Sequence, residues 1–161
     1  MKKEKEAKPT ASTYGERQVW TVTIVAPIET VWSALVRTEE VLPFLFGTVC
    51  ETESGLQPGK RMRMVSKNRR LAISVGEVLE FNPPFRFSHT TSFTQVEGEQ
   101  PARTTYELKE IPGGTQLTLI SEAVPGTKTG RMVLGGSMIV ANLKRYVETG
   151  RGTPFPDDLK F

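Results

Sequence analysis

The 161-residue sequence contains a single cysteine, Cys50, and a single histidine, His89. One cysteine excludes an intrachain disulfide and a cysteine-based zinc cluster, and one histidine excludes a metal site built on two histidines. The glycines at 135–136 do not form a phosphate-binding loop, because the lysine that such a loop requires does not follow them. The sequence therefore predicts no metal site and no cofactor.

Long apolar runs and charge of one sign are also missing. The longest apolar run, over 132–141, is broken by two glycines and a serine and is too short to span a bilayer. The chain has 21 Lys and Arg residues against 18 Asp and Glu residues, a formal net charge of +3, which does not favour nucleic-acid binding. No apolar segment follows the first basic residues, so we identify no secretory signal and expect a cytoplasmic protein.

Hydrophobic residues make up 37% of the chain, which suits one folded domain of this length. We place this domain at 14–150. Mixed charges with few apolar residues predict a disordered tail at 1–13. The glycines and prolines at 150–156 predict an irregular tail over 151–161.

The first regular segment, 18–26, alternates apolar and β-branched residues with others, which is the pattern of a strand. Pro27 ends this strand and suits the first turn of a helix, where Glu29 complements the helix dipole. Apolar residues at three- and four-residue spacing continue this helix to Leu35. A second short helix is expected over 38–42.

Six strand-like segments follow, separated by turn residues. The segment 60–66 shows the pattern most clearly, because its two methionines alternate with two arginines and so predict one buried and one solvated face. Gly76 lies inside the next segment and indicates a bulge or a bend. The expected strands cover 46–53, 60–66, 71–81, 85–93, 104–109 and 117–121.

A long amphipathic helix follows the last strand. Thr127 or Thr129 can cap it, and it extends to about Thr149, with Gly150 as its stop and Asn142 on its polar side. A run of strands bounded by helices indicates an α+β fold, in which only the terminal helix is large enough to cover the apolar face of the sheet. The sequence therefore predicts a helix-grip fold, a curved antiparallel sheet of about six or seven strands wrapped around the C-terminal helix, with two short helices after the first strand.

Four segments together resemble a known superfamily. They are APIETVWSAL at 26–35, GEVLEFNPPFRFSHT at 76–90, TYELKEIPGGTQLTL at 105–119 and NLKRYVE at 142–148. Their order and spacing are similar to the START-related, birch-pollen-allergen-like helix-grip superfamily, also called SRPBCC, in the branch named after the activator of the heat-shock protein 90 ATPase. The resemblance implies the same fold. It leaves the function open, because the superfamily includes lipid carriers, cyclases and co-chaperone domains.

The side chains expected to face the terminal helix are large and apolar or aromatic, with a few polar groups among them. This mixture is typical of small-molecule pockets, and it is equally typical of a packed core. A dry void of roughly 300 Å³ would cost roughly 7 kcal/mol, so a ligand-sized space must hold water or ligand, or be filled by flexible side chains. The candidate lining residues are Met62, Met64, Phe87, His89, Thr91, Tyr106, Leu117, Leu119, Gly135 and Met138.

Gly135 and its neighbour Gly136 have two interpretations. Each glycine costs a helix roughly 1 kcal/mol relative to alanine, which suggests that its small size is needed. Either the helix approaches the sheet closely at this point, or its thin face leaves room for a ligand or for an entrance.

Three functions are compatible with these residues. The leading hypothesis is a binding module for a small hydrophobic or amphipathic molecule, held between the sheet and the terminal helix. The second, implied by the name of the branch, is a domain that binds a chaperone. The third is a cofactor-free enzyme of the cyclase or hydratase type, in which His89 acts as a general base with Tyr106 or Glu107 as its partner. The sequence has no nucleophile–histidine–acid signature, so we expect binding rather than catalysis.

Basic residues are densest over 60–70, on a strand and a hairpin turn that include Arg61, Arg63, Arg69 and Arg70. A solvated face explains this pattern, and so does a surface for an acidic protein partner or an anionic headgroup. The interleaved aromatics that binding of a single-stranded nucleic acid requires are absent from this segment.

Overall fold

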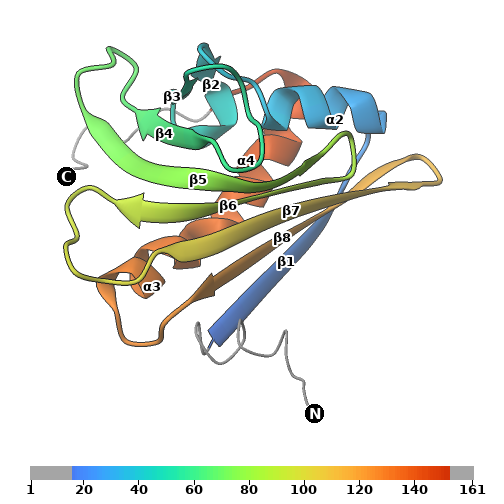
Figure 1. The fold of residues 1–161 in the computed structure, drawn as a ribbon. Helices are drawn as coiled ribbons and strands as arrows, with labels where there is room; N and C mark the ends of the chain where they lie inside the picture. Colours follow the sequence, from blue (N-terminus) through green and yellow to red (C-terminus); the bar gives the residue numbers. More distant parts are fainter. Residues whose placement is uncertain (1–15, 153–161) are drawn as a thin grey trace.

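The structure is a computed structural model in which residues 16–152 are described. Eight antiparallel strands form one curled sheet in the order β1-β8-β7-β6-β5-β4-β3-β2, and the C-terminal helix lies behind it in the view of Figure 1. The predicted α+β helix-grip fold is confirmed, with eight strands instead of six or seven. The strands are β1 (Glu16–Ile24), β2 (Val41–Leu42), β3 (Thr48–Thr52), β4 (Arg61–Val65), β5 (Ala72–Asn82), β6 (Arg86–Phe93), β7 (Ala102–Ile111) and β8 (Gly114–Ala123).

Helix α2 (Ile28–Leu35) follows β1 as the sequence predicts. Pro27 is its N-cap residue and Glu29 lies in its first turn, where a negative charge is favourable. Its apolar side, which includes Val31 and Trp32, is buried in the core. This helix therefore closes one end of the space between the sheet and the C-terminal helix.

The predicted second helix over 38–42 is wrong. The chain forms strand β2 there, which pairs with β3, followed by the 3-10 turn η1 (Pro43–Leu45). Glu39 has a left-handed backbone conformation with φ of 64°, which an α-helix does not allow. Its carboxylate instead accepts a hydrogen bond from the backbone N–H of Thr52 at 2.8 Å, and this bond holds the segment against β3.

The sheet curls where the strand register shifts. One shift lies between Met64 and Val65 in the pairing of β4 with β5, and another between Val78 and Glu80 in the pairing of β5 with β6. Such bulges bend a strand and increase its twist. Gly76 lies between these two points, and a Cβ atom there would collide with a backbone carbonyl of β6. Glycine at this position therefore permits the close approach of the two strands.

The terminal helical region has three parts, α3 (Lys128–Met132), the 3-10 turn η2 (Val133–Gly135) and α4 (Gly136–Thr149), so the predicted continuous helix is wrong. Thr127 caps α3, and its hydroxyl accepts from the N–H of Gly130 at 2.9 Å. Gly150 ends α4 with φ of 79°, as predicted. The break follows from the two adjacent glycines, which weaken a helix, and it lets α3 contact β8 while α4 packs along β1.

The hydrophobic core lies between the sheet, α2 and α4. Its largest fully buried side chains include Phe44 of η1, Ile24 of β1, Leu117 and Leu119 of β8, and Leu143 of α4. The tail expected at 1–13 lies outside the described residues. Of the tail expected at 151–161, only 151–152 are described, and they are exposed and have no regular structure.

Candidate ligand-binding site

The concave face of the sheet, which is the face toward α4, carries side chains in cross-strand rows. One row, here called the aromatic row, runs Trp20, Leu119, Tyr106 and Phe87 over β1, β8, β7 and β6, each residue paired with the next. The next row toward α3, here called the polar row, runs Gln18, Ser121, Thr104 and His89 over the same strands. Because side chains on one face recur every two residues, this face changes from apolar to polar along the strands.

Hydroxyl groups of the two rows are buried without a protein partner. Ser121 is 4% exposed, Thr104 is 8% exposed and Tyr106 is 6% exposed. Among the described residues none of these three hydroxyls has a hydrogen-bond partner, although each oxygen remains open to contact with water. Buried polar groups are normally hydrogen-bonded, so these three are suited to bound water or a ligand.

His89 links the two rows. Its ring centroid lies 5.1 Å from that of Phe87 and 6.4 Å from that of Tyr106. Its Nδ1 atom lies 2.9 Å from the backbone carbonyl oxygen of Thr90, which can only accept, so Nδ1 carries a proton. Burial lowers the pKa of His89, so the ring is neutral near pH 7. The Nε2 atom is then a hydrogen-bond acceptor, and it has no partner among the described residues.

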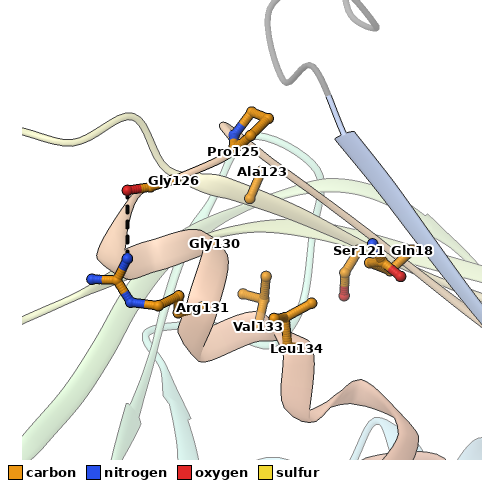
Figure 2. Close-up of a pocket in the computed structure, with 9 residues that line it drawn as sticks. All are labelled: Gln18, Ser121, Ala123, Pro125, Gly126, Gly130, Arg131, Val133 and Leu134. Carbon is orange, nitrogen blue, oxygen red and sulfur yellow. Dashed lines mark hydrogen bonds between the residues drawn. The ribbon is translucent and has the colours of Figure 1, made fainter.

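An open pocket of about 100 Å³ lies at the end of the polar row. Figure 2 shows Gln18 and Ser121 on the sheet side and Val133 and Leu134 on the opposite side. The guanidinium of Arg131 donates to the carbonyl of Gly126 at 3.5 Å. Its charged end is therefore directed toward the turn after β8, and the part of the pocket between sheet and η2 is lined by uncharged groups. The remaining lining residues are Ala123, Pro125 and Gly130.

Most of the predicted lining residues lie on the concave face. The apolar and aromatic ones are mainly buried in the core, and none of the ten predicted residues lines the open pocket. Buried are Met62, Phe87, Tyr106, Leu117 and Leu119, and partly buried are Met64, His89 and Thr91.

The predictions for Gly135 and Met138 are wrong. Both residues are exposed, Met138 at 51%, on the outer side of the helical region. The buried glycine is Gly136, where a Cβ atom would collide with the ring of Trp20. The helix therefore approaches the sheet closely here. The error follows from the helix break, because a helix turns by about 100° per residue and the phase of 135–138 was drawn from an unbroken helix.

The acid–base groups considered for catalysis are only partly together. Tyr106 shares the concave face with His89, but burial raises the pKa of its phenol, so it stays protonated. Glu107 lies on the convex face, where it forms an ion pair with Arg86. Cys50 is buried, and burial followed by the charges of Glu39 and Glu51 raises the pKa of its thiol to about 12. Neither the tyrosine nor the cysteine is therefore an activated nucleophile near pH 7.

The sequence did not predict the surroundings of three further polar residues. Gln18 and Thr104 belong to the polar row, and their positions two residues before Trp20 and Tyr106 on the same strand faces are the signal that could have revealed them. Asn142 was placed on the polar side of the terminal helix, but it is only 8% exposed. Its Nδ2 atom has no hydrogen-bond partner among the described residues.

The basic segment 60–70 is largely neutralised by nearby acids. Arg63 and Arg69 both form ion pairs with Glu51, at 2.8 Å and 3.1 Å. Arg61 and Arg70 form no ion pair within the described part of the chain. A surface groove of about 680 Å³ runs beside this segment, and it is lined by acidic as well as basic side chains.

Other kinds of site find no support among residues 16–152. No helix there is long and apolar enough to cross a membrane. Nor does this range contain a cluster of three or more histidine, cysteine or acidic side chains that could hold a metal ion.

Comparison with known families agrees with this fold. The family model described as Activator of Hsp90 ATPase homolog 1-like protein matches residues 25–148, from the end of β1 to the end of α4. The chain belongs to this family. The branch of the superfamily that the four sequence segments resemble is thereby confirmed. A comparison with curated proteins found no match.

Solved structures show the same architecture as this Activator of Hsp90 ATPase homolog 1-like chain. The AHSA1-like protein from Aeromonas hydrophila is 21% identical with a TM-score of 0.60, over 84% of this chain and 94% of that one. CalU16 from Micromonospora echinospora is 18% identical with a TM-score of 0.65, over 83% and 77% of the two chains. DynU16, from the dynemicin biosynthetic locus, is 20% identical with a TM-score of 0.66, over 86% of this chain and 49% of that one. At these identities the likeness concerns the fold alone.

Proposed function

We propose that the protein is a binding module for a small amphipathic molecule, whose polar end contacts the polar row and whose entrance is the pocket of Figure 2. The observation that carries this proposal is the set of buried hydroxyls on Thr104, Tyr106 and Ser121 without a partner among residues 16–152, of which Ser121 lines the open pocket. In a core selected for packing alone, these positions would carry apolar side chains.

The size of the pocket restricts the ligand. Sites for drug-sized molecules enclose roughly 300–1,000 Å³, whereas this pocket has about 100 Å³. A one-ring molecule suits this volume, and a larger one requires α3 and η2 to move outward. These segments present exposed apolar side chains, with Met132 at 41% and Leu134 at 52% exposed, which such a ligand could cover.

An enzymatic role is the second proposal, because His89 and Tyr106 share one face with ring centroids 6.4 Å apart. In this proposal His89 is the general base, since its Nε2 atom is unprotonated and faces no competing partner among the described residues. Within residues 16–152 no Asp or Glu side chain orients the ring, whose Nδ1 is held by a backbone carbonyl instead. Binding therefore stays the leading proposal.

Binding of a chaperone draws support from the family name and from Arg61 and Arg70, which are free of ion pairs within residues 16–152. Its test is a pull-down with the chaperone at low and moderate salt. Charge reversal at these two arginines should abolish an interaction that depends on them, and an interaction that ignores the reversal contradicts this use of the surface.

The binding proposal is tested with three probes of different polarity, 1-octanol, decanoate and 2-naphthol, in native mass spectrometry and thermal-shift measurements. We expect at least one probe to bind and to raise the melting temperature. Ser121→Leu, which fills the pocket, should weaken binding at least tenfold, while Ser92→Leu on the convex face of β6 should leave it unchanged. Absence of binding by all three probes, or equal effects of the two variants, contradicts the proposal.

A further inference from the structure

We propose that α3 and η2, residues 128–135, form a lid over the pocket of Figure 2, and that the carboxylate of Glu99 is the latch that keeps this lid closed. The inference rests on the proposed function, since it concerns how a ligand reaches the pocket. Its test needs no ligand, so its failure is distinguishable from the failure of the binding proposal.

The lid has few buried side chains of its own. Among residues 128–135 only Thr129 is buried. The apolar contact of the lid with β5 and β6 is made by Met132, which lines a narrow gap together with Leu71 and Phe93 and is still 41% exposed. Because segments with few buried contacts open at a lower free-energy cost than the core, the lid is the part of the pocket wall that opens most easily.

The polar attachment of the lid comes from the loop between β6 and β7. The carboxylate of Glu99 accepts a hydrogen bond from the N–H of Lys128 at 3.0 Å and from the N–H of Thr129 at 2.8 Å, one to each oxygen. The first N–H groups of a helix have no partner within it, so a carboxylate is favourable there. These two N–H groups, that of Thr129 first, lower the pKa of Glu99, so the latch is ionised at pH 7. Within residues 16–152 no other hydrogen bond joins α3 or η2 to the sheet or to a loop between two strands.

The loop that carries Glu99 is itself attached to the sheet. The hydroxyl of Thr94 donates to the carbonyl of Ala72 at 2.6 Å, and its N–H donates to the carbonyl of Ile73 at 3.0 Å. The latch therefore holds the lid from a fixed point on β5.

Glycines lie at both ends of the lid and can serve as hinges. Gly126 has φ of 79°, Gly135 is exposed, and an added Cβ atom would have no neighbour within 4 Å at either position. The backbone can therefore rotate at both glycines without a collision. Gly136 packs against Trp20 and fixes the start of α4, so the lid can swing outward while α4 stays in place. This motion uncovers Ser121 and widens the pocket.

Hydrogen exchange measured by mass spectrometry on the full chain at pH 7 tests the latch. Glu99→Ala removes both hydrogen bonds, and Glu99→Gln replaces the charged acceptor by a weaker neutral one. The amides of 130–133 do not bond to Glu99, so their exchange reports the movement of the lid and not the loss of two bonds. We expect them to exchange at least fivefold faster in Glu99→Ala and by a smaller factor in Glu99→Gln, while α4 and the sheet stay unchanged. Glu97→Gln, in the same loop but without a hydrogen bond to the lid, is the matched control and should change nothing.

Thiol labelling tests whether the lid covers the pocket. Ser121→Cys places a thiol on the pocket wall, and its reaction with methyl methanethiosulfonate should be at least fivefold faster when Glu99→Gln is added. The natural thiol of Cys50 is buried and protonated, so it does not compete.

Three results would overturn the inference. Unchanged exchange of 130–133 in the Glu99 variants, or an acceleration spread evenly over the chain, contradicts the latch. Faster exchange without faster labelling contradicts the role of this segment as a lid over the pocket. If Glu99→Ala does not fold, Glu99→Gln decides, and failure of every probe to bind contradicts the proposed function and leaves the latch unaffected.

Discussion

Gly135 and Gly136 are neighbours in sequence, yet an added methyl group would meet very different surroundings at the two positions. At Gly136 an added Cβ would lie against the six-membered ring of Trp20, with its Cη2 atom at 2.8 Å, whereas at Gly135 no atom lies within 4 Å. The φ angle is −58° at Gly136 and −73° at Gly135, so alanine can adopt the backbone conformation of either residue. Alanine substitutions at the two glycines therefore distinguish the effect of close helix packing from the effect of helix propensity.

The expected effects have opposite signs. Overpacking a core costs typically about 1–3 kcal/mol, so Gly136→Ala should lower the free energy of unfolding by that amount. Gly135→Ala should raise it by about 0.4–1 kcal/mol, because alanine reduces the conformational entropy of the unfolded chain. Urea denaturation followed by far-UV circular dichroism measures both, since this signal reports mainly on the backbone.

A double-mutant cycle shows whether Trp20 is the cause. Trp20→Leu alone should destabilise the protein, but Gly136→Ala added to it should cost much less than in the wild-type background, because the clashing ring is gone. The close approach of α4 to β1 would be refuted as the reason for Gly136 by either of two results. One is additive effects of Trp20→Leu and Gly136→Ala, and the other is that Gly135→Ala destabilises the protein as much as Gly136→Ala.

Three further predictions concern charge and backbone strain. Burial lowers the pKa of His89 below its usual 6.5, so the unfolded chain binds the proton first as the pH falls. The free energy of unfolding should therefore decrease as the pH drops below about 6.5. Urea titrations at several pH values measure this decrease, which should be absent in His89→Phe. The raised pKa values of Cys50 and Tyr106 act at the other end, so stability should fall as the pH rises above about 9, and Tyr106→Phe should flatten part of this alkaline loss. Arg69 has φ of 63° and an ion pair with Glu51, so Arg69→Ala should lose the pair and keep the strain, whereas Arg69→Gly should be more stable than Arg69→Ala by roughly 1 kcal/mol in thermal unfolding.

The strands and their faces could be predicted from the sequence because a strand has a fixed period of two. Once Met62 is assigned to the buried side, its neighbours Arg61 and Arg63 must be exposed, and the structure has this arrangement. The segment 38–42 could not be assigned in this way, since a strand of two residues is too short to show a period. Its conformation is fixed by tertiary contacts, among them the bond from Thr52 to the Glu39 carboxylate.

The candidate site was predicted only on its sheet side. His89 and Tyr106 could be placed on one face by counting along strands whose pairing was still unknown. The helix side failed at Gly135 and Met138 because helical phase accumulates error, and a break of one turn rotates every later side chain away from its expected direction. Asn142 shows the same weakness, since its burial depends on how α4 packs in the fold and not on its neighbours in sequence.

The gradient along the concave face explains why the helix is broken where it is. The aromatic row fills the space beneath α4, and Trp20 reaches the helix so closely that only glycine fits above it at Gly136. One row further on, the side chains become small and polar, and α3 and η2 cover them from a different direction. A continuous helix would leave a wider gap above the smaller side chains of the polar row. Because the helix is broken, α4 can cover the aromatic row while α3 and η2 cover the polar row. The open pocket at Ser121 is the space that remains between these two arrangements. Arg131 lines it from the helical side, and its sheet side is uncharged because of the same alternation that places Arg103 and Glu122 on the convex face.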